Sequence, residues 1–157
     1  ATGLLLLSPG IPMIASGQDY LRSKQGVQNT YQRGDLNALN YPEFMHVVSF
    51  HEWVRKLISF RYSDHGKLFR LHNFLPEEQY RIIEGPHNSF GLMILSDPDE
   101  IVSGCLLIFV NPQDQEEEIL LPDFLIQKTK KILIGSTTSN FGLIPPISIQ
   151  VWYLKEH

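Results

Sequence analysis

The sequence has little cysteine, little net charge and no long hydrophobic run, and each shortage excludes a class of protein. Cys105 is the only cysteine among 157 residues, so no internal disulfide can form and cysteine-based zinc motifs are absent. The formal net charge is −4 and the basic residues are not clustered, which argues against binding to a phosphate backbone. No apolar stretch is long enough to cross a bilayer. We therefore expect neither a nucleic-acid partner nor a membrane partner.

What is present is the composition of a globular protein. Hydrophobic residues make up 43% and charged residues 19% of the chain, which predicts a real core rather than disorder. The apolar run from Leu4 to Leu7 has no basic residue before it and stops at Ser8-Pro9-Gly10, so it predicts a buried helix end rather than a signal peptide. Ala1 lies inside this expected helix without a capping residue, and we expect a fragment or processed piece.

Residues 1–75 have the pattern of half of a βα repeat. Thr2 to Leu7 fits a helix end, and Ile11 to Ala15 fits a short strand buried on both faces, as in parallel sheets. The segment from Gly17 to Tyr41 is rich in Gly, Asn, Gln and Asp, which predicts a long loop with a function. A second helix is expected to begin at Pro42-Glu43 and to end within residues 63–66.

Residues 76–157 have a different pattern, in which short apolar runs are separated by turn residues. This pattern predicts an antiparallel β-sandwich, and Cys105, inside one of the apolar runs, is expected to be a buried thiol. The expected strands are Ser89 to Ser96, Gly104 to Val110, Glu117 to Leu121, Lys131 to Gly135 and Ile147 to Leu154. Asp114 to Glu118 is expected to be a solvated hairpin tip.

The long loop holds the candidate site. It supplies many hydrogen-bonding side chains and tyrosines directly after an expected strand end, where α/β folds place ligands. Such a set suits a sugar, whose hydroxyl groups need oriented donors and acceptors, and the alternative is a solvated loop whose polar residues serve turns. The candidate substrate-binding residues are Gln18, Asp19, Arg22, Lys24, Asn29, Tyr31 and Asp35.

A resemblance to a known family favours the sugar site. Gly10-Ile-Pro-Met-Ile-Ala-Ser-Gly-Gln-Asp-Tyr-Leu-Arg-Ser-Lys-Gln-Gly26, followed by Asn29-Thr-Tyr31, Asp35 and Asn37 to Tyr41, resembles the last barrel strand and loop of pullulanase- and isoamylase-type debranching enzymes of the α-amylase superfamily. Trp53 to Arg61 and Phe69-Arg70 resemble the eighth barrel helix and the segment after it. Phe109 to Pro112, Leu120 to Pro122 and Leu143 to Pro146 resemble the C-terminal β-sandwich of those enzymes.

The resemblance implies an α+β fragment with two parts: residues 1–75 as the last βα unit of a (β/α)8 barrel, and residues 76–157 as an antiparallel β-sandwich. It implies the C-terminal portion of a glycoside hydrolase that acts on α-1,6 branch linkages of glycogen, starch or pullulan. The partners would be an α-glucan and the missing N-terminal barrel portion of the same enzyme. We expect no cofactor and no metal.

Three departures from the family pattern stand out. Asp19 replaces a usual Glu, Ser16 replaces an Ala, and Asn40-Tyr41 replaces Asp-Trp, so a carboxylate present in relatives is absent here. The family's catalytic Asp, Glu and Asp motifs do not occur in this sequence. Retaining hydrolysis needs two carboxyl groups about 5–5.5 Å apart, and one strand with its loop does not supply them. We therefore expect no catalytic residue, and the chain alone should be inactive.

The remaining candidates favour structural roles. His46 and His51 lie on diverging faces of the expected helix, without a metalloprotease motif, and are expected to be solvated or capping. Trp53 is expected in the core among Val54, Leu57 and Ile58. The second functional hypothesis is a non-catalytic carbohydrate-binding or interaction module centred on the sandwich. Its aromatic residues show no planar-row spacing.

Overall fold

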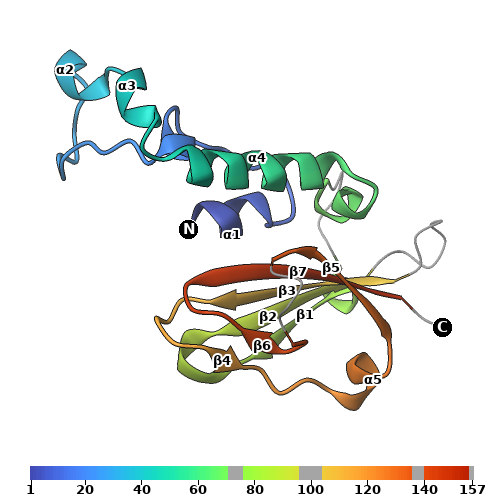
Figure 1. Ribbon diagram of the computed structural model, residues 1–157. Coiled ribbons are helices and arrows are strands. Elements are labelled where there is room, and N and C mark those ends of the chain that lie inside the picture. The colour runs from blue at the N-terminus through green and yellow to red at the C-terminus, as the bar shows by residue number, and fades with distance from the viewer. Residues whose placement is uncertain (71–75, 96–103, 136–139, 156–157) are drawn as a thin grey trace.

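The computed structural model describes residues 1–70, 76–95, 104–135 and 140–155. A helical layer lies over one face of a five-stranded sheet, and a two-stranded sheet lies against the other face (Figure 1). This α+β arrangement with an antiparallel sheet agrees with the predicted fold class. A barrel unit is not formed by these residues alone.

The helical layer consists of α1 (Thr2–Leu6), α4 (Val48–Tyr62) and the 3-10 turn η2 (His65–Phe69). In α4 the side chains of Val54, Leu57 and Phe60 are buried at helical spacing, and they pack with Leu6 and Phe69. Trp53 is partly buried against the same cluster, as the sequence predicts. The helical layer is thus held to the sheet by an apolar stripe of α4 together with buried side chains of α1 and η2.

The second helix begins later than predicted. Pro42 lies in a separate turn, α3 (Tyr41–Phe44), and α4 starts only at Val48 because Val47 takes a non-helical backbone conformation with φ −127°. Met45 and His46 between the two helices are exposed, so no tertiary packing stabilises a continuous helix there. The predicted end is confirmed, since α4 stops at Tyr62 and Ser63 is extended.

The main sheet is antiparallel throughout, with strand order β1-β2-β3-β7-β5. Its strands are β1 (Tyr80–Glu84), β2 (Phe90–Leu95), β3 (Cys105–Asn111), β5 (Thr129–Ile134) and β7 (Ser148–Lys155). The small sheet pairs β4 (Glu117–Glu118) with β6 (Leu143–Ile144), and α5 (Asp123–Ile126) lies between them in sequence. Four of the five predicted strands match closely, whereas the predicted strand Glu117 to Leu121 shrinks to β4.

The central strand β3 is buried along its whole length and separates two hydrophobic clusters. Leu106, Ile108 and Val110 face the helical layer, while Leu107 and Phe109 face the small sheet. Cys105 is 2% exposed within the second cluster, which confirms the predicted buried thiol. Because the first cluster joins the helices to the sheet, residues on both sides of position 75 share one core.

The predicted strand Ile11 to Ala15 is wrong for this chain. These residues are irregular, and Ile11 and Met13 are 93% and 85% exposed. A strand needs a neighbour to complete its backbone hydrogen bonds, and no described strand pairs with this segment. Just before this segment, the Gly10 N–H donates to the Phe69 carbonyl at 2.8 Å.

His65 gives the fold a pH dependence. Burial, and then the nearby Lys131 ammonium, lower the pKa of the His65 imidazole, which packs on Tyr153 with ring centroids 4.3 Å apart. The folded protein therefore favours neutral His65, so stability is present above the ordinary pKa of about 6.5 and falls as pH drops below it. Urea unfolding at about pH 7.5 and about pH 5 should show a smaller difference for His65→Gln than for the wild type. The exposed His46→Gln is the control, and an unchanged pH difference in His65→Gln contradicts the prediction.

Candidate functional site

The candidate site is the polar loop that runs from η1 (Gln18–Tyr20) through α2 (Gly34–Asn37). It leaves the helical layer and projects past the end of the sheet, where α2 and α3 form the outermost elements (Figure 1). The loop has a base, a middle and a tip, and the predicted site residues are divided among these three parts. The hydrogen bonds of each part decide which side chains are available to a ligand.

At the base, two predicted residues connect the loop to the helices. Gln18 donates from Nε2 to Thr2 at 3.0 Å and accepts the Ala15 N–H at 3.0 Å. Asp19 Oδ2 lies 2.9 Å from Nδ1 of His51 on α4, and both side chains are partly exposed. Gln18 and Asp19 therefore orient the loop, and the prediction of a solvated or capping His51 is wrong, because tertiary folding brings a carboxylate to it.

In the middle, a buried threonine organises the loop. Thr30 is 5% exposed, accepts Lys24 Nζ at 3.1 Å and donates to Asn37 Oδ1 at 2.9 Å. Asn37 Nδ2 returns a bond of 2.5 Å to the Thr30 carbonyl, and Arg22 donates to the Asn37 carbonyl at 3.2 Å. Arg22 and Lys24 therefore stabilise the loop by bonds within it. Thr30 and Asn37 are not among the predicted site residues, although both lie in the segment that resembles the debranching enzymes.

At the tip, the predicted residues face solvent. Asn29 accepts the Tyr31 N–H at 3.2 Å in a tight turn, and the Tyr31 side chain is 88% exposed. Asp35 accepts two bonds from Arg33, at 2.9 and 2.7 Å. This bidentate pair lowers the pKa of Asp35 and raises the pKa of Arg33. The tip thus presents an aromatic ring together with amide and charged groups, which are the groups that bind sugar rings and hydroxyls.

The two carboxylates of the loop do not act as a pair. Asp19 is bonded to His51 at the base, and Asp35 is bonded to Arg33 at the tip. Retaining hydrolysis needs two carboxyl groups facing one bond, and these two belong to different parts of the loop. Over the ranges that the structure describes, no cluster of three His, Cys, Asp or Glu suits a metal ion, and no helix is long and apolar enough to cross a membrane.

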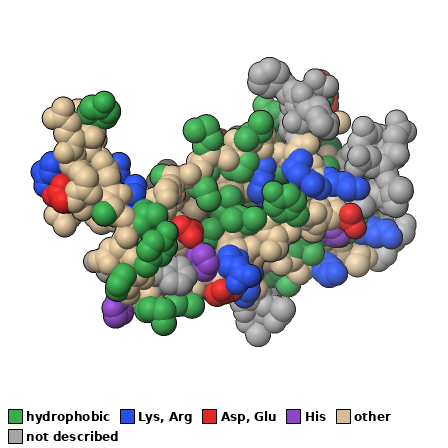
Figure 2. Space-filling model, turned by 90° about the horizontal axis from the view of Figure 1, so that it is seen from above, with side chains coloured by type: hydrophobic (Ala, Val, Ile, Leu, Met, Phe, Trp, Pro, Cys, Tyr) green, Lys and Arg blue, Asp and Glu red, His purple; other side chains and the backbone are tan. Residues whose placement is uncertain are grey.

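Beside the base lies an apolar surface of the helical layer. A groove of about 540 Å³ is lined by Leu6, Ile11, Ile14, Ile58 and Tyr62, with Arg61 and Arg70 among its polar lining. Ile11, Ile14 and Tyr62 are 93%, 42% and 75% exposed. Hydrophobic side chains also gather over the helical layer when it is viewed from its outer side (Figure 2). A patch of this kind is typical of a surface that contacts further protein.

Comparison with known proteins identifies the type of chain. No family model matches it. A pullulanase of Bacillus subtilis (strain 168) is 40% identical over 62 residues, which are 39% of this chain and 9% of that protein. Those 62 residues resemble a pullulanase in sequence, and the chain has a pullulanase-type fold.

The pullulanase-type fold extends over nearly the whole chain. The pullulanase from Anoxybacillus sp. LM18-11 matches 99% of this chain and 22% of its own, with a TM-score of 0.76 and 23% identity. The Bacillus acidopullulyticus pullulanase matches 97% and 19%, with a TM-score of 0.76 and 18% identity. The Paenibacillus barengoltzii pullulanase, in complex with maltohexaose and α-cyclodextrin, matches 99% and 24%, with a TM-score of 0.77 and 20% identity. The chain therefore spans less than a quarter of each of these solved chains.

Proposed function

We propose that this pullulanase-type chain is the C-terminal portion of a glycoside hydrolase that acts on α-1,6 linkages of α-glucans such as glycogen, starch or pullulan. The observation that carries the proposal is the agreement between the thirty-residue loop motif and a pullulanase fold over nearly the full chain. Residues 1–75 would supply the last βα unit of the barrel. Residues 76–157 would form a β-sandwich domain that stabilises it.

The exposed apolar segment supports the barrel assignment. Ile11 to Ala15 has the composition of a buried strand but finds no neighbouring strand among the described residues. Ile58 and Tyr62 on α4 line the groove beside it. In the proposed assembly, the rest of the barrel pairs with this segment and covers the groove. Burial of Ile11 and Met13 alone would contribute about 2–3 kcal/mol per side chain to that assembly.

The loop would form one wall of the sugar-binding cleft. Its tip offers the exposed Tyr31 ring for stacking, with Asn29 and Asp35 beside it in sequence for hydroxyl groups. Arg22 and Lys24 would act mainly by holding the loop in shape, since their polar groups bond within it. The complex of the Paenibacillus barengoltzii pullulanase with maltohexaose makes maltooligosaccharides the natural ligands to test.

The 157-residue chain alone should not hydrolyse pullulan. It carries no second carboxyl group opposite Asp19 or Asp35 in the loop, so neither nucleophile nor acid/base is in place. Release of reducing sugar from pullulan measures this directly. Adding the upstream part of the same enzyme should restore hydrolysis, whereas turnover by the isolated chain above the buffer rate would contradict the proposal.

Tyr31→Ala should weaken glucan binding without destabilising the fold. The Tyr31 ring is 88% exposed, so its loss removes a stacking surface and little packing. In the complete enzyme we expect the Kd for maltotetraose to rise about three- to tenfold, with an unchanged unfolding temperature. Gln32→Ala, at the next exposed position, is the matched control. Equal affinities of Tyr31→Ala and wild type would remove Tyr31 from the site.

The second hypothesis, a carbohydrate-binding module centred on the sheet, is not favoured by the aromatic residues. Phe141 packs edge-on against both Phe109 and Trp152, with ring centroids 5.7 and 5.2 Å apart. These rings fill the core between the two sheets and offer no planar surface to a sugar. Maltotetraose titrated into the chain and followed by amide chemical shifts distinguishes the hypotheses, because a module would show its shifts in the sheet rather than in residues 18–35.

A further inference from the structure

The exposed tip of the polar loop is closed by one pair of side chains. Thr30 and Asn37 bond each other twice, since the Thr30 hydroxyl donates to Asn37 Oδ1 at 2.9 Å and Asn37 Nδ2 donates to the Thr30 carbonyl at 2.5 Å. Residues 31–35 between them are all exposed. The chain from Tyr31 to Leu36 thus forms a small loop whose two ends are joined by side-chain bonds.

The same closure fixes the turn that carries Tyr31. The Thr30 carbonyl accepts the Arg33 N–H at 2.9 Å in addition to the Asn37 amide, so Tyr31 lies at the second position of a turn that begins at Thr30. Asn29 Oδ1 accepts the Tyr31 N–H at 3.2 Å. The backbone of Tyr31 is therefore held by bonds before and after it, although its side chain is 88% exposed.

Two cationic side chains tie this closure to the preceding part of the loop. Arg22 Nη1 donates to the Asn37 carbonyl at 3.2 Å, and Lys24 Nζ donates to the Thr30 hydroxyl at 3.1 Å. Because residues 31–35 are exposed, no hydrophobic packing orders them. Their order depends instead on the hydrogen bonds that converge on Thr30 and Asn37.

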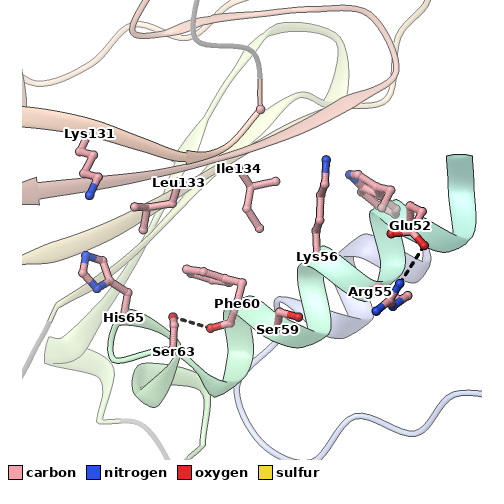
Figure 3. Close-up of a pocket in the computed structure, with 12 residues that line it drawn as sticks. Glu52, Arg55, Lys56, Ser59, Phe60, Ser63, His65, Lys131, Leu133 and Ile134 are labelled. Carbon is pink, nitrogen blue, oxygen red and sulfur yellow. Dashed lines mark hydrogen bonds and ion pairs between the residues drawn. The ribbon is translucent and has the colours of Figure 1, made fainter.

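The groove between α4 and β5 lacks a comparable polar arrangement. It has a volume of about 900 Å³, and Leu133 and Ile134 point into it from β5 (Figure 3). The Ser63 hydroxyl on the opposite wall donates to the Phe60 carbonyl at 2.6 Å. These side chains offer a sugar no oriented pair of polar groups, so we expect glucan binding at the polar loop and not in this groove.

We propose that Thr30 and Asn37 are positioning residues for the sugar site, because they form the Tyr31 turn before the ligand arrives. This role rests on the proposed function, and it is exerted through Tyr31, since Thr30 is 5% exposed and offers little surface to a sugar. A loop that is ordered in advance loses less conformational entropy on binding. The affinity gained from stacking on Tyr31 therefore depends on the Thr30–Asn37 closure.

Thr30→Val and Thr30→Ser in the complete enzyme separate the hydroxyl from the shape. Valine keeps the shape of threonine but cannot bond Asn37 or Lys24 through its side chain, whereas serine keeps both bonds. We expect Thr30→Val to raise the Kd for maltotetraose and the KM for pullulan about three- to tenfold, with kcat changed less than twofold. Thr30→Ser should match the wild type. A lower kcat with unchanged KM would indicate loss of folded enzyme alone and overturn the positioning role.

A double-mutant cycle with Tyr31→Ala tests whether Thr30 acts through the ring. In the Tyr31→Ala background, Thr30→Val should raise the Kd for maltotetraose by less than a further twofold, because the ring to be positioned is gone. Additive effects of the two substitutions overturn the role. Asn37→Asp keeps the acceptor for the Thr30 hydroxyl but places a carboxylate against the Thr30 carbonyl, so it should raise the Kd as Thr30→Val does.

The wild-type enzyme reports separately on the proposed function. If it does not bind maltotetraose, the proposed function is contradicted and the positioning role falls with it. If it binds and Thr30→Val binds equally well, the positioning role alone is overturned. Maltotetraose titrated into the 157-residue chain should shift the amides of residues 29–37. Saturable shifts confined to residues 56–65 and 131–135 would place the glucan in the groove of Figure 3 and overturn the role as well.

Discussion

Arg61→Leu should destabilise the chain more than any exposed substitution, by about 2–5 kcal/mol. Arg61 is 6% exposed and donates to the carbonyls of Leu6, Ser8 and Gly10 at 2.6, 2.8 and 2.6 Å, and to Phe69 at 3.4 Å. Its guanidinium also lies 5.5 Å from the centre of the Phe69 ring. One side chain thus joins the segment after α1, helix α4 and the turn η2.

The loss of stability in Arg61→Leu follows from the carbonyl groups that are left without the arginine donor. Leucine fills part of the space but donates nothing, so the buried Leu6 carbonyl loses its bond to Arg61, at about 1–3 kcal/mol. The part-buried carbonyls of Ser8 and Gly10 lose theirs as well, whereas the Phe69 carbonyl still accepts the Gly10 N–H. Burial, and then Arg70, lower the pKa of Arg61, yet arginine keeps its charge in proteins. Arg61→Lys should also destabilise, because an ammonium group cannot reach carbonyl groups spread over four residues with the planar geometry of a guanidinium.

Urea unfolding measures the effect, with Arg55→Leu as the matched control. Arg55 lies on the same helix but is exposed, and among the described residues it pairs with Glu52 alone, so its loss should change the free energy of unfolding by less than about 0.5 kcal/mol. A total stability of about 5–15 kcal/mol makes the Arg61 effect easy to resolve. Coinciding unfolding curves for Arg61→Leu and wild type would show that the carbonyl groups find other partners.

Asn111→Leu should cost about 2–4 kcal/mol, because Asn111 connects the main sheet to the loops around the small sheet. The side chain is 1% exposed, and its Nδ2 donates to the carbonyls of Gln115, Ile144 and Pro145 at 2.8, 3.1 and 3.0 Å. Its Oδ1 accepts the Gln113 N–H at 2.9 Å. Leucine has a similar volume and satisfies none of these groups.

Asn111→Asp separates hydrogen bonding from shape. A carboxylate facing three carbonyl groups repels them, so folding raises the pKa of the introduced group above its ordinary value near about 3.9. The variant should therefore lose most stability at neutral pH and recover part of it as pH falls through the raised pKa. Asn140→Ala, an exposed asparagine before β6, is the control and should unfold like wild type. Equal losses in Asn111→Asp at pH 7 and at low pH would contradict this account.

The sequence by itself determined the strands whose apolar runs are continuous. Cys105 to Val110 could be predicted because a run of six apolar residues bounded by turn residues is buried in any arrangement that forms a core. Strand β1 was missed because it lies at the edge of the sheet, where Arg81 and Ile82 are both exposed and alternation is lost. The strands of β4 and β6 are too short for any pattern.

In the polar loop, too, the sequence predicted some features and the tertiary structure decided others. Its composition and motif predicted a polar segment suited to a sugar, since residue types alone decide which hydrogen bonds a segment offers. Only the tertiary structure decided that Asp19 bonds His51, thirty-two positions away, and that Thr30 holds Lys24 and Asn37 within the loop. The first pairing joins distant segments, and the other two depend on how the loop folds back on itself, which no regular sequence period indicates.

The predicted strand at Ile11 to Ala15 shows most clearly what the sequence alone does not determine. Ile11 to Ala15 has the side chains of a buried strand, but a strand exists only with a partner that completes its hydrogen bonds, and the described residues offer none. The sequence determined which segments prefer to be buried, extended or polar, because those preferences reside in each residue and its neighbours. The tertiary structure decided which preferences are satisfied, because pairing, burial and the Arg61 contacts require segments that are distant along the chain.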